Sequence, residues 1–194
     1  AMAPRLLLAS TSRYRALLLE RLGLPFGVQA PGVDEARSPR EGPVARALRL
    51  ARAKAEAVAT RHPDACVVGA DQVAVRGTET LGKPGDIERC IQQLSRSSGR
   101  EVEFLTAVFV LDSAAARSEA HVDRTVVRFR SLTQAEIGRY VSIESPLDCA
   151  GGFKAESLGI SLFDRIESAD PTGLTGLPLI WLCGALRRAG IPVP

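Results

Sequence analysis

The chain of 194 residues contains few histidines and cysteines. Its two histidines, His62 and His121, lie in polar surroundings, so acid–base catalysis by histidine is not expected. Its four cysteines are far apart and form no Cys-x-x-Cys pair, which favours reduced, mostly buried thiols in a cytoplasmic protein over a disulfide or a zinc site. The N-terminal apolar run, residues 6–9, is too short for a signal peptide or a membrane span.

Aromatic side chains and net charge are scarce as well. Aromatic residues make up 5% of the chain and the formal net charge is +3, so neither a nucleic acid nor a membrane is an expected partner. The arginines at positions 46, 49 and 52 are typical of a solvated helix face. With 45% hydrophobic and 24% charged residues, the composition is that of a soluble globular protein. At this length we expect one domain, or two lobes that share one core.

The hydrophobic pattern predicts strands and helices along the whole chain. Strands are expected at residues 5–9, 26–30, 66–75, 79–81, 101–111 and 118–129. Helices are expected at residues 12–22, 44–60, 86–97, 133–143 and 178–189, with an irregular glycine-rich stretch at residues 146–159. Because strand–helix units are mixed with local antiparallel pairs, the sequence predicts an α/β fold with a mixed, twisted sheet flanked by helices.

One carboxylate, Asp71, interrupts the apolar strand at residues 66–75. An unpaired carboxylate there would cost several kcal/mol, so a metal, a lysine or a group of backbone donors is expected beside it. Lys54 falls on the apolar stripe of its helix, where it either snorkels at the margin or points to a carboxylate or a phosphate. Lys83, between Gly82 and Pro84, is a second lysine that could serve phosphate binding.

The acidic pair Asp34-Glu35 lies in a predicted loop. If this pair and Asp71 meet, their carboxylates would bind a hard divalent cation such as Mg²⁺, which prefers oxygen ligands and keeps several waters. Such a cation lowers the pKa of a bound water and neutralises phosphate charge.

The segment Ala9–Arg15 runs from a predicted strand into a predicted helix. Ser12 can cap that helix, and Arg13 and Arg15 then lie in its first turn, where positive charge is disfavoured by about 0.3–1 kcal/mol each. A bound phosphate would reverse that sign, since hydroxyls, N–H groups and guanidiniums are its usual donors. The alternative is an ordinary capped helix with two solvated arginines.

Taken in this order, these segments resemble the Maf family of nucleoside triphosphate pyrophosphatases over nearly the whole chain. The resemblance rests on an S-x-S-x-x-R element from Ser10 to Arg15, a V-D-E element ending at Glu35, the helix lysine Lys54, a G-x-D element ending at Asp71, and G-K-P around Lys83. Within the family the chain looks closest to the YceF-type branch, thought to act on 7-methyl-GTP. The features that point there are Asp71-Gln72-Val73, the run Cys149–Glu156 and the late stretch Gly176–Ile180.

The resemblance implies a Maf/ITPase-like α/β fold, one domain over residues 1–194, with two lobes around a nucleotide-binding cleft and often a homodimer. It implies Asp71 as catalytic base or metal-held carboxylate, with Glu35 as its partner at a divalent cation, Mg²⁺ or Mn²⁺. The triphosphate-binding residues that it implies are Lys54, Lys83, Ser10, Ser12 and Arg15. The base-recognition positions that it implies are Tyr14, Gln72 and Glu156.

The implied base-recognition residues suit a methylated guanine, which carries positive charge on its ring. The aromatic face of Tyr14 would attract that charge, and the Glu156 carboxylate could accept the N–H donors of the base. The chain departs from the family's usual pattern at Arg13, where proline is common, and at Ala16, where the branch commonly has a second arginine.

The sequence therefore predicts a metal-dependent hydrolase that cleaves a nucleoside triphosphate between its α and β phosphates, giving a monophosphate and pyrophosphate. Its expected role is to remove modified nucleotides, with 7-methyl-GTP as the favoured substrate. Two alternatives stay open: the same reaction on dTTP or UTP, and a nucleotide-binding regulator of cell division. A nucleic-acid-binding module is disfavoured, since no interleaved aromatic–basic pattern is present.

Overall fold

The computed structural model describes residues 3–194, and within that range it contains seven β-strands, five α-helices and two short 3-10 helices. The strands are β1 (Arg5–Ala9), β2 (Phe26–Gln29), β3 (Ala65–Arg76), β4 (Glu79–Leu81), β5 (Glu101–Asp112), β6 (Arg117–Phe129) and β7 (Phe163–Ser168). The helices are α1 (Arg13–Glu20), α2 (Pro43–Ala59), α3 (Ile87–Ser97), α4 (Gln134–Glu144), α5 (Leu179–Arg188), η1 (Ala150–Gly152) and η2 (Leu158–Leu162). Every predicted strand and helix is therefore confirmed, with ends that differ by at most a few residues.

The strands form one mixed sheet in the order β2-β1-β3-β5-β6-β7, with β4 paired to β3. The predicted α/β class with a mixed sheet is confirmed. The chain divides into two compact units, the first made of residues 3–72, 106–123 and 170–194 and the second of residues 73–105 and 124–169. The single domain expected over the whole chain stays a prediction.

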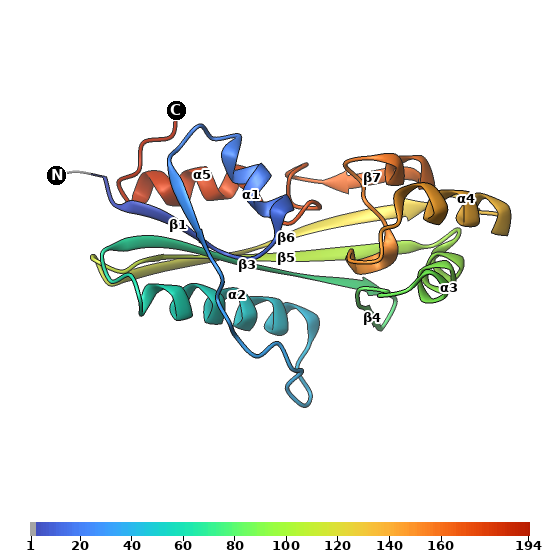
Figure 1. Cartoon of the computed structure of the whole chain (residues 1–194), viewed down its shortest axis with the longest axis horizontal. Coiled ribbons are helices and arrows are strands. Elements are labelled where there is room, and N and C mark those ends of the chain that lie inside the picture. Colours follow the sequence, from blue (N-terminus) through green and yellow to red (C-terminus); the bar gives the residue numbers. More distant parts are fainter. Residues whose placement is uncertain (1–2) are drawn as a thin grey trace. The chain divides into compact units, whose positions relative to one another are not determined.

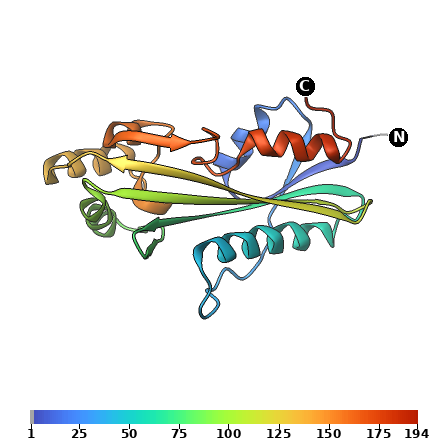
Figure 2. The ribbon, with the colours of Figure 1, turned by 180° about the vertical axis from the view of Figure 1, so that it is seen from behind.

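In the first unit, helices cover both faces of the parallel strands β1, β2 and β3 (Figure 1). Because side chains alternate along a strand, residues at even positions of β1 and β3 share one face. That face carries Leu6, Leu8 and Val68, which pack with α1 and α5. Gly69, at an odd position, lies against α2 on the opposite face. The view from behind also shows α2 on the other side of the strands from α5 (Figure 2).

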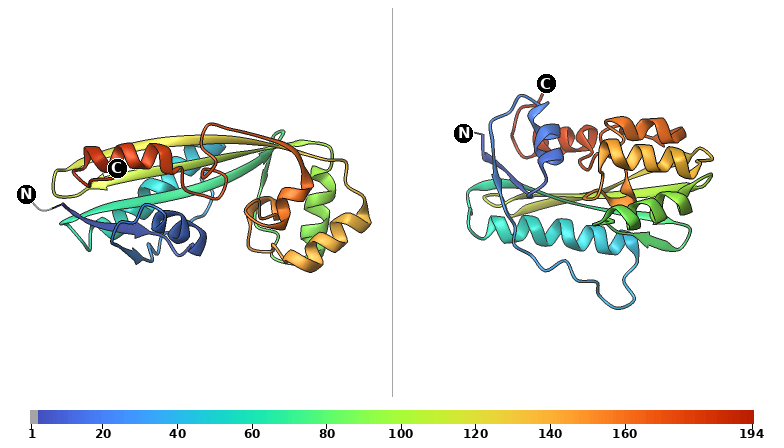
Figure 3. Two further views of the ribbon diagram at one scale, coloured as in Figure 1. Left: turned by 90° about the horizontal axis from the view of Figure 1, so that it is seen from above. Right: turned by 45° about the vertical axis from the view of Figure 1, so that its right-hand side comes forward.

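In the second unit, β4 folds back on β3 through a turn at Gly77, whose φ of 62° favours glycine. The two strands thus form a β-hairpin. Helix α3 contacts α4 and η1, and α4 contacts η2 (Figure 3). The core includes four phenylalanines whose ring centroids lie 4.9–5.5 Å apart in edge-to-face pairs: Phe104, Phe129, Phe153 and Phe163.

The second unit also contains β7, which the sequence analysis did not predict. Strand β7 pairs antiparallel with β6, yet five of its six residues are exposed. A strand with so little burial lacks the alternation of apolar and polar residues by which strands are recognised.

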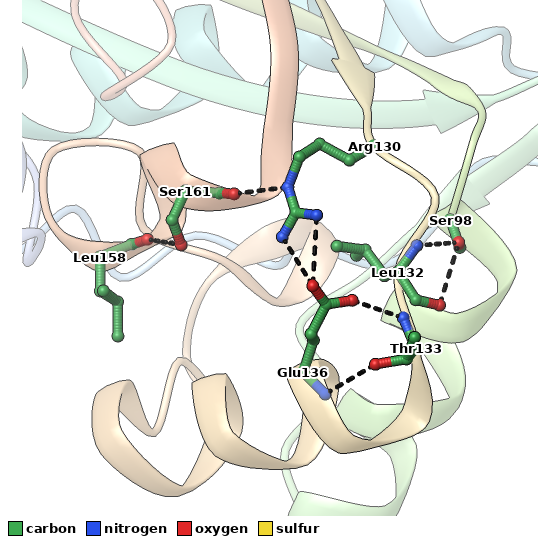
Figure 4. Close-up of polar contacts among 7 residues, drawn as sticks. All are labelled: Ser98, Arg130, Leu132, Thr133, Glu136, Leu158 and Ser161. Carbon is green, nitrogen blue, oxygen red and sulfur yellow. Dashed lines mark hydrogen bonds and ion pairs between the residues drawn. The ribbon is translucent and has the colours of Figure 1, made fainter.

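Helix α4 begins with a capping box (Figure 4). The Thr133 hydroxyl accepts from Glu136 N–H at 3.2 Å, and Glu136 Oε2 accepts from Thr133 N–H at 2.7 Å. Arg130 contacts Glu136 Oε1 at 3.3 Å and donates from Nε to the Ser161 carbonyl at 2.9 Å. The start of α4 is thereby tied to η2.

Two further expectations concern membranes and thiols. None of the helices described in residues 3–194 is long and apolar enough to cross a membrane. The four cysteines are free thiols, and two of them, Cys66 and Cys90, are buried, whereas Cys149 and Cys183 are half-buried.

Candidate functional site

The strand order of the first unit points to a candidate position for a ligand site. From β1 the chain passes through α1 to β2 on one side, and from β2 through α2 to β3 on the other side of β1. Helices α1 and α2 lie on opposite faces, so the strand order reverses between β1 and β3. In parallel α/β sheets, ligands bind outside the carboxyl ends of strands at such a reversal. Ala9 of β1 is paired with Gly69 of β3, so the residues that follow each of them lie at this edge.

Gly69 brings α2 and β3 unusually close together. A Cβ atom on Gly69 would overlap the Ala51 carbonyl oxygen and lie 2.9 Å from the Ala55 backbone nitrogen. Only glycine permits this approach of a helix backbone to the strand. Asp71, two residues on, faces the same side of the sheet and meets Lys54 of α2.

Lys54 bridges two carboxylates. Its Nζ lies 2.9 Å from Asp71 Oδ1 and 2.8 Å from Glu35 Oε1. The two oxygens are therefore at most about 5.7 Å apart, the sum of those distances. Lys54 and Asp71 are 7% and 8% exposed, whereas the Glu35 side chain is 56% exposed. The structure thus resolves the ambiguity at Lys54: its charge is buried against carboxylates and does not snorkel to solvent.

Arg15 adds a second cation to this cluster. Burial lowers the pKa of its guanidinium from the ordinary value, and the Asp71 and Glu35 carboxylates act in the opposite direction. Its Nε donates to the Gly176 carbonyl at 2.8 Å. Two cations and two carboxylates thus lie within electrostatic reach of one another, with a formal sum of zero.

The turn between β1 and α1 has the predicted cap. Ser12 is the N-cap, and its hydroxyl accepts from Arg15 N–H at 3.4 Å, while Ser10 Oγ accepts from Ser12 N–H at 3.0 Å. Both serines accept from backbone N–H groups, which leaves each hydroxyl proton able to donate to an anion at the positive end of α1.

The two base-recognition candidates in this unit already have partners. The Arg13 guanidinium lies 5.1 Å from the centroid of the Tyr14 ring, so one face of that ring is occupied by a cation of the protein itself. Gln72 faces away from Asp71, and its Nε2 donates to Thr106 Oγ1 at 3.0 Å and to the carbonyls of Gly173 and Leu174 at 3.3 and 2.9 Å. All of these bonds use Nε2, so Gln72 Oε1 is the atom left to accept a hydrogen bond from a ligand.

Lys83 and Glu156 belong to the second unit, and both are exposed. The backbone on either side of Lys83 is fixed: Gly82 O accepts from the Gln93 amide at 3.1 Å, and Gly85 N–H donates to Leu147 O at 3.0 Å.

The loop before Glu156 is anchored in the same way. Phe153 is buried among the phenylalanines, and Lys154 N–H donates to the Tyr140 hydroxyl at 2.9 Å. Burial raises the pKa of Tyr140, so this hydroxyl stays protonated at neutral pH.

Sequence reasoning missed two buried residues near the site, Asp170 and Thr172. Asp170 Oδ1 accepts from the Thr172 N–H at 2.8 Å, a local turn that an Asp followed two residues later by Thr favours. The sequence Asp170-Pro171-Thr172 is the pattern from which this turn could have been predicted.

Few side chains at this site could bind the divalent cation that the family resemblance implies. Within residues 3–194, no group of three or more histidines, cysteines and carboxylates is placed to hold a metal ion. Glu35 and Asp71 supply two carboxylates at one place, which matches the one or two protein carboxylates that Mg²⁺ takes when waters and substrate phosphates fill its other positions. The donor set therefore fits a cation that binds together with a phosphate ligand.

The chain is similar to known proteins over nearly its whole length. It is 50% identical over 191 residues to a 7-methyl-GTP pyrophosphatase of Alcanivorax borkumensis, with 98% of this chain and 97% of that protein covered. It is 53% identical to a protein of the same name from Xanthomonas axonopodis pv. citri, covering 98% of this chain and 100% of that protein, and 52% identical to one from Bordetella pertussis. The solved structure of the Staphylococcus aureus Ham1 protein aligns with a TM-score of 0.46 and 13% identity over 80% of this chain and 89% of that chain, too low to carry an argument. The Maf-like protein family matches residues 5–189, and the chain belongs to that family.

Proposed function

We propose that the chain is a nucleoside triphosphate pyrophosphatase that cleaves the α–β phosphate bond of a modified nucleotide, with 7-methyl-GTP preferred. Relatives that share about half of its residues over nearly their full length bear the name 7-methyl-GTP pyrophosphatase. The single observation that carries the proposal is the buried Asp71, bridged by Lys54 to Glu35, at the strand-order reversal beside the α1 N-terminus.

Asp71 is the proposed general base. Its Oδ1 is held by Lys54, whereas no donor among the described residues hydrogen-bonds Oδ2. Oδ2 can therefore take a proton from a water that attacks the phosphate. The bond between the α phosphorus and the bridging oxygen breaks as the water oxygen bonds to that phosphorus, and pyrophosphate leaves.

Lys54, Arg15 and the β1–α1 turn are proposed to bind the phosphates. The two cations lie beside the carboxylates, and the hydroxyls of Ser10 and Ser12 can donate to phosphate oxygens at the α1 N-terminus. Lys83 of the second unit is proposed to bind the same triphosphate, the role that the family resemblance gives it.

A divalent cation, Mg²⁺ or Mn²⁺, would be held by Glu35 and by Asp71 Oδ1, which it would share with Lys54, so that Asp71 Oδ2 stays available as the base; this cation site is part of the proposal. When bound, it neutralises phosphate charge and lowers the pKa of its water. The charges support this proposal: Lys54 and Arg15 are already offset by two carboxylates, so Lys83 and the cation would together oppose the several negative charges of a triphosphate.

The base is proposed to be recognised by Tyr14, Gln72 and Glu156. Gln72 Oε1 and the Glu156 carboxylate are acceptors, and guanine presents N–H donors. The face of the Tyr14 ring opposite Arg13 would attract the positive charge of a 7-methylated ring. A cytoplasmic location and a homodimer complete the proposal, with neither nucleic acid nor membrane as a partner.

The test is pyrophosphate release from 7-methyl-GTP, GTP, dTTP, UTP and CTP with Mg²⁺ or Mn²⁺. We expect 7-methyl-GTP to be preferred and Asp71→Asn to lower kcat by about a hundredfold or more, since loss of a general base typically removes that factor. Asp112→Asn is the matched control, because Asp112 is also 8% exposed and lies in the first unit.

Each other result has a definite meaning. Preference for dTTP or UTP would keep the reaction and overturn the proposed base recognition. Nucleotide binding without pyrophosphate release would refute the enzyme and favour a nucleotide-binding regulator. Equal loss in Asp71→Asn and Asp112→Asn would refute the role of Asp71.

A further inference from the structure

The loop that precedes α5 is closed by two buried side chains, Asp170 and Thr172, which are 4% and 7% exposed. Asp170 Oδ1 accepts from the Thr172 hydroxyl at 2.6 Å, and Asp170 Oδ2 accepts from the Ile180 N–H at 2.8 Å. The Thr172 hydroxyl in turn accepts from the Leu179 N–H at 2.9 Å. The N-cap of α5 is Pro178, which makes no side-chain cap bond, so Asp170 and Thr172 satisfy the first N–H groups of α5 from the far end of the loop.

The same loop supplies backbone carbonyls to two site residues. Gly173 O and Leu174 O accept from the Gln72 amide, and Gly176 O accepts from Arg15 Nε. Carbonyl oxygens at three nearly consecutive positions thus orient one side chain proposed to read the base and one proposed to bind phosphate.

Packing leaves this loop few alternative paths. A Cβ atom on Gly173 would overlap the Asp123 carboxylate, and Gly176 has a φ of 121°, which side-chain-bearing residues rarely adopt. The Thr106 hydroxyl donates to Gly173 O at 2.9 Å and also accepts from Gln72. The loop, Thr106 and Gln72 therefore form one hydrogen-bonded group whose ends are fixed by Asp170 and Thr172.

If the hydrogen bonds of Asp170 and Thr172 are lost, the loop would no longer hold the side chains of Arg15 and Gln72 in place. Arg15 has a long side chain with many rotamers, and a fixed acceptor at Nε restricts them. If the ends of the loop are released, the carbonyls of residues 173–176 are no longer held at one position, and both side chains gain freedom that binding must remove.

We infer that Asp170 and Thr172 are positioning residues that set phosphate affinity through Arg15 and base selectivity through Gln72. This inference rests on the proposed function for the identity of the substrate. Neither residue is assigned a contact with the nucleotide.

The experiment compares Thr172→Val, which removes the hydroxyl, with Thr172→Ser, which keeps it, and with Asp170→Asn. Asp112→Asn controls for loss of a buried carboxylate elsewhere in the first unit. Pyrophosphate release is measured with 7-methyl-GTP and dTTP, and the affinity for inorganic triphosphate is measured by calorimetry. Thermal unfolding is recorded for each variant, so that the kinetic measurements are made well below its melting temperature.

We expect Thr172→Val and Asp170→Asn to raise KM more than they lower kcat and to reduce the preference for 7-methyl-GTP over dTTP. Both variants should weaken the binding of inorganic triphosphate about tenfold, in line with loss of a hydrogen bond to a charged group. Thr172→Ser should restore all three. With Arg15→Lys as background, Thr172→Val should weaken triphosphate much less, because the two residues act through the same contact.

The inference is overturned if Thr172→Val melts at a lower temperature but keeps wild-type selectivity and triphosphate affinity, since the closure would then only stabilise the fold. If the wild-type protein releases no pyrophosphate from any nucleotide, the proposed function fails, and the calorimetric arm alone decides the inference. If the wild-type protein does not bind triphosphate, the inference fails together with the phosphate site.

Discussion

Gly69 offers the sharpest test of how the fold holds the site. Replacing it with alanine places a methyl group where the Ala51 carbonyl oxygen now lies, and 2.9 Å from the Ala55 nitrogen. Both are backbone atoms of α2, so no side-chain rotation can relieve the overlap. Helix α2 must retreat from β3 by more than about 1 Å to restore an ordinary contact of about 3.5 Å.

The retreat has two measurable consequences. Overpacking of a core typically costs about 1–3 kcal/mol, and each kcal/mol lowers the melting temperature of a chain this size by roughly 2–4 °C. The same movement carries Lys54 away from Asp71, and a misplacement of about 1 Å can lower turnover by roughly a hundredfold. We therefore expect Gly69→Ala to melt roughly 2–12 °C below the wild-type protein and to lose most of its pyrophosphate release from 7-methyl-GTP.

Gly138→Ala is the matched control. Gly138 lies inside α4, and a Cβ atom there would meet nothing within 4 Å. Alanine is favoured over glycine in a helix by about 0.5–1 kcal/mol, so this variant should melt slightly higher and keep its activity. If Gly69→Ala behaves like Gly138→Ala in circular dichroism melts and in turnover, the close approach of α2 to β3 does not hold Lys54 in place.

Two further predictions concern stability. Thr133→Ala removes the hydroxyl that caps α4, so it should lower the free energy of unfolding by about 1 kcal/mol without changing turnover; an unchanged chemical denaturation midpoint would contradict the role of the cap. Burial raises the pKa of Cys66 to about 12 and that of Cys90 to about 11, so at pH 8 both thiols should resist iodoacetamide until the chain is unfolded in urea. Since the Cys66 thiol ionises near pH 9.0 in the unfolded chain, its burial contributes fully to the free energy of unfolding below that pH. This contribution is lost as the pH rises toward 12, by about 1.4 kcal/mol per pH unit. Rapid labelling of the native protein, or an alkaline limb without this loss of stability, would contradict the burial.

Much of the fold and part of the site could be predicted from local sequence patterns. Asp71 is conspicuous because a carboxylate in an apolar strand requires a partner, and Lys54 because a lysine on the apolar stripe of a helix does too. The N-caps at Ser12, Asp86 and Thr133 could be predicted because a cap depends only on residues three positions apart.

Other parts of the site depend on contacts that no local pattern encodes. Glu35 is mostly exposed on a loop, and the sequence could point to the pair Asp34-Glu35 only on the condition that it meets Asp71, which no local pattern encodes. The closure by Asp170 and Thr172 matters because Gly176 O meets Arg15, a contact between residues 161 positions apart. The stacking of Arg13 on Tyr14 was likewise not foreseen, since neighbouring side chains on a helix usually point apart.

The division of the chain into two units sets an order for its synthesis. The second unit lies wholly between residues 73 and 169, whereas the first is completed only by residues 170–194. A nascent chain thus carries β1 and β3 with one apolar face covered only in part, by α1, until Leu182 and Leu186 of α5 emerge, which gives chaperones a window to bind that face. A nonsense mutation just before α5 would leave the second unit whole in sequence, yet it would remove the closing helix of the unit that carries Asp71 and Lys54.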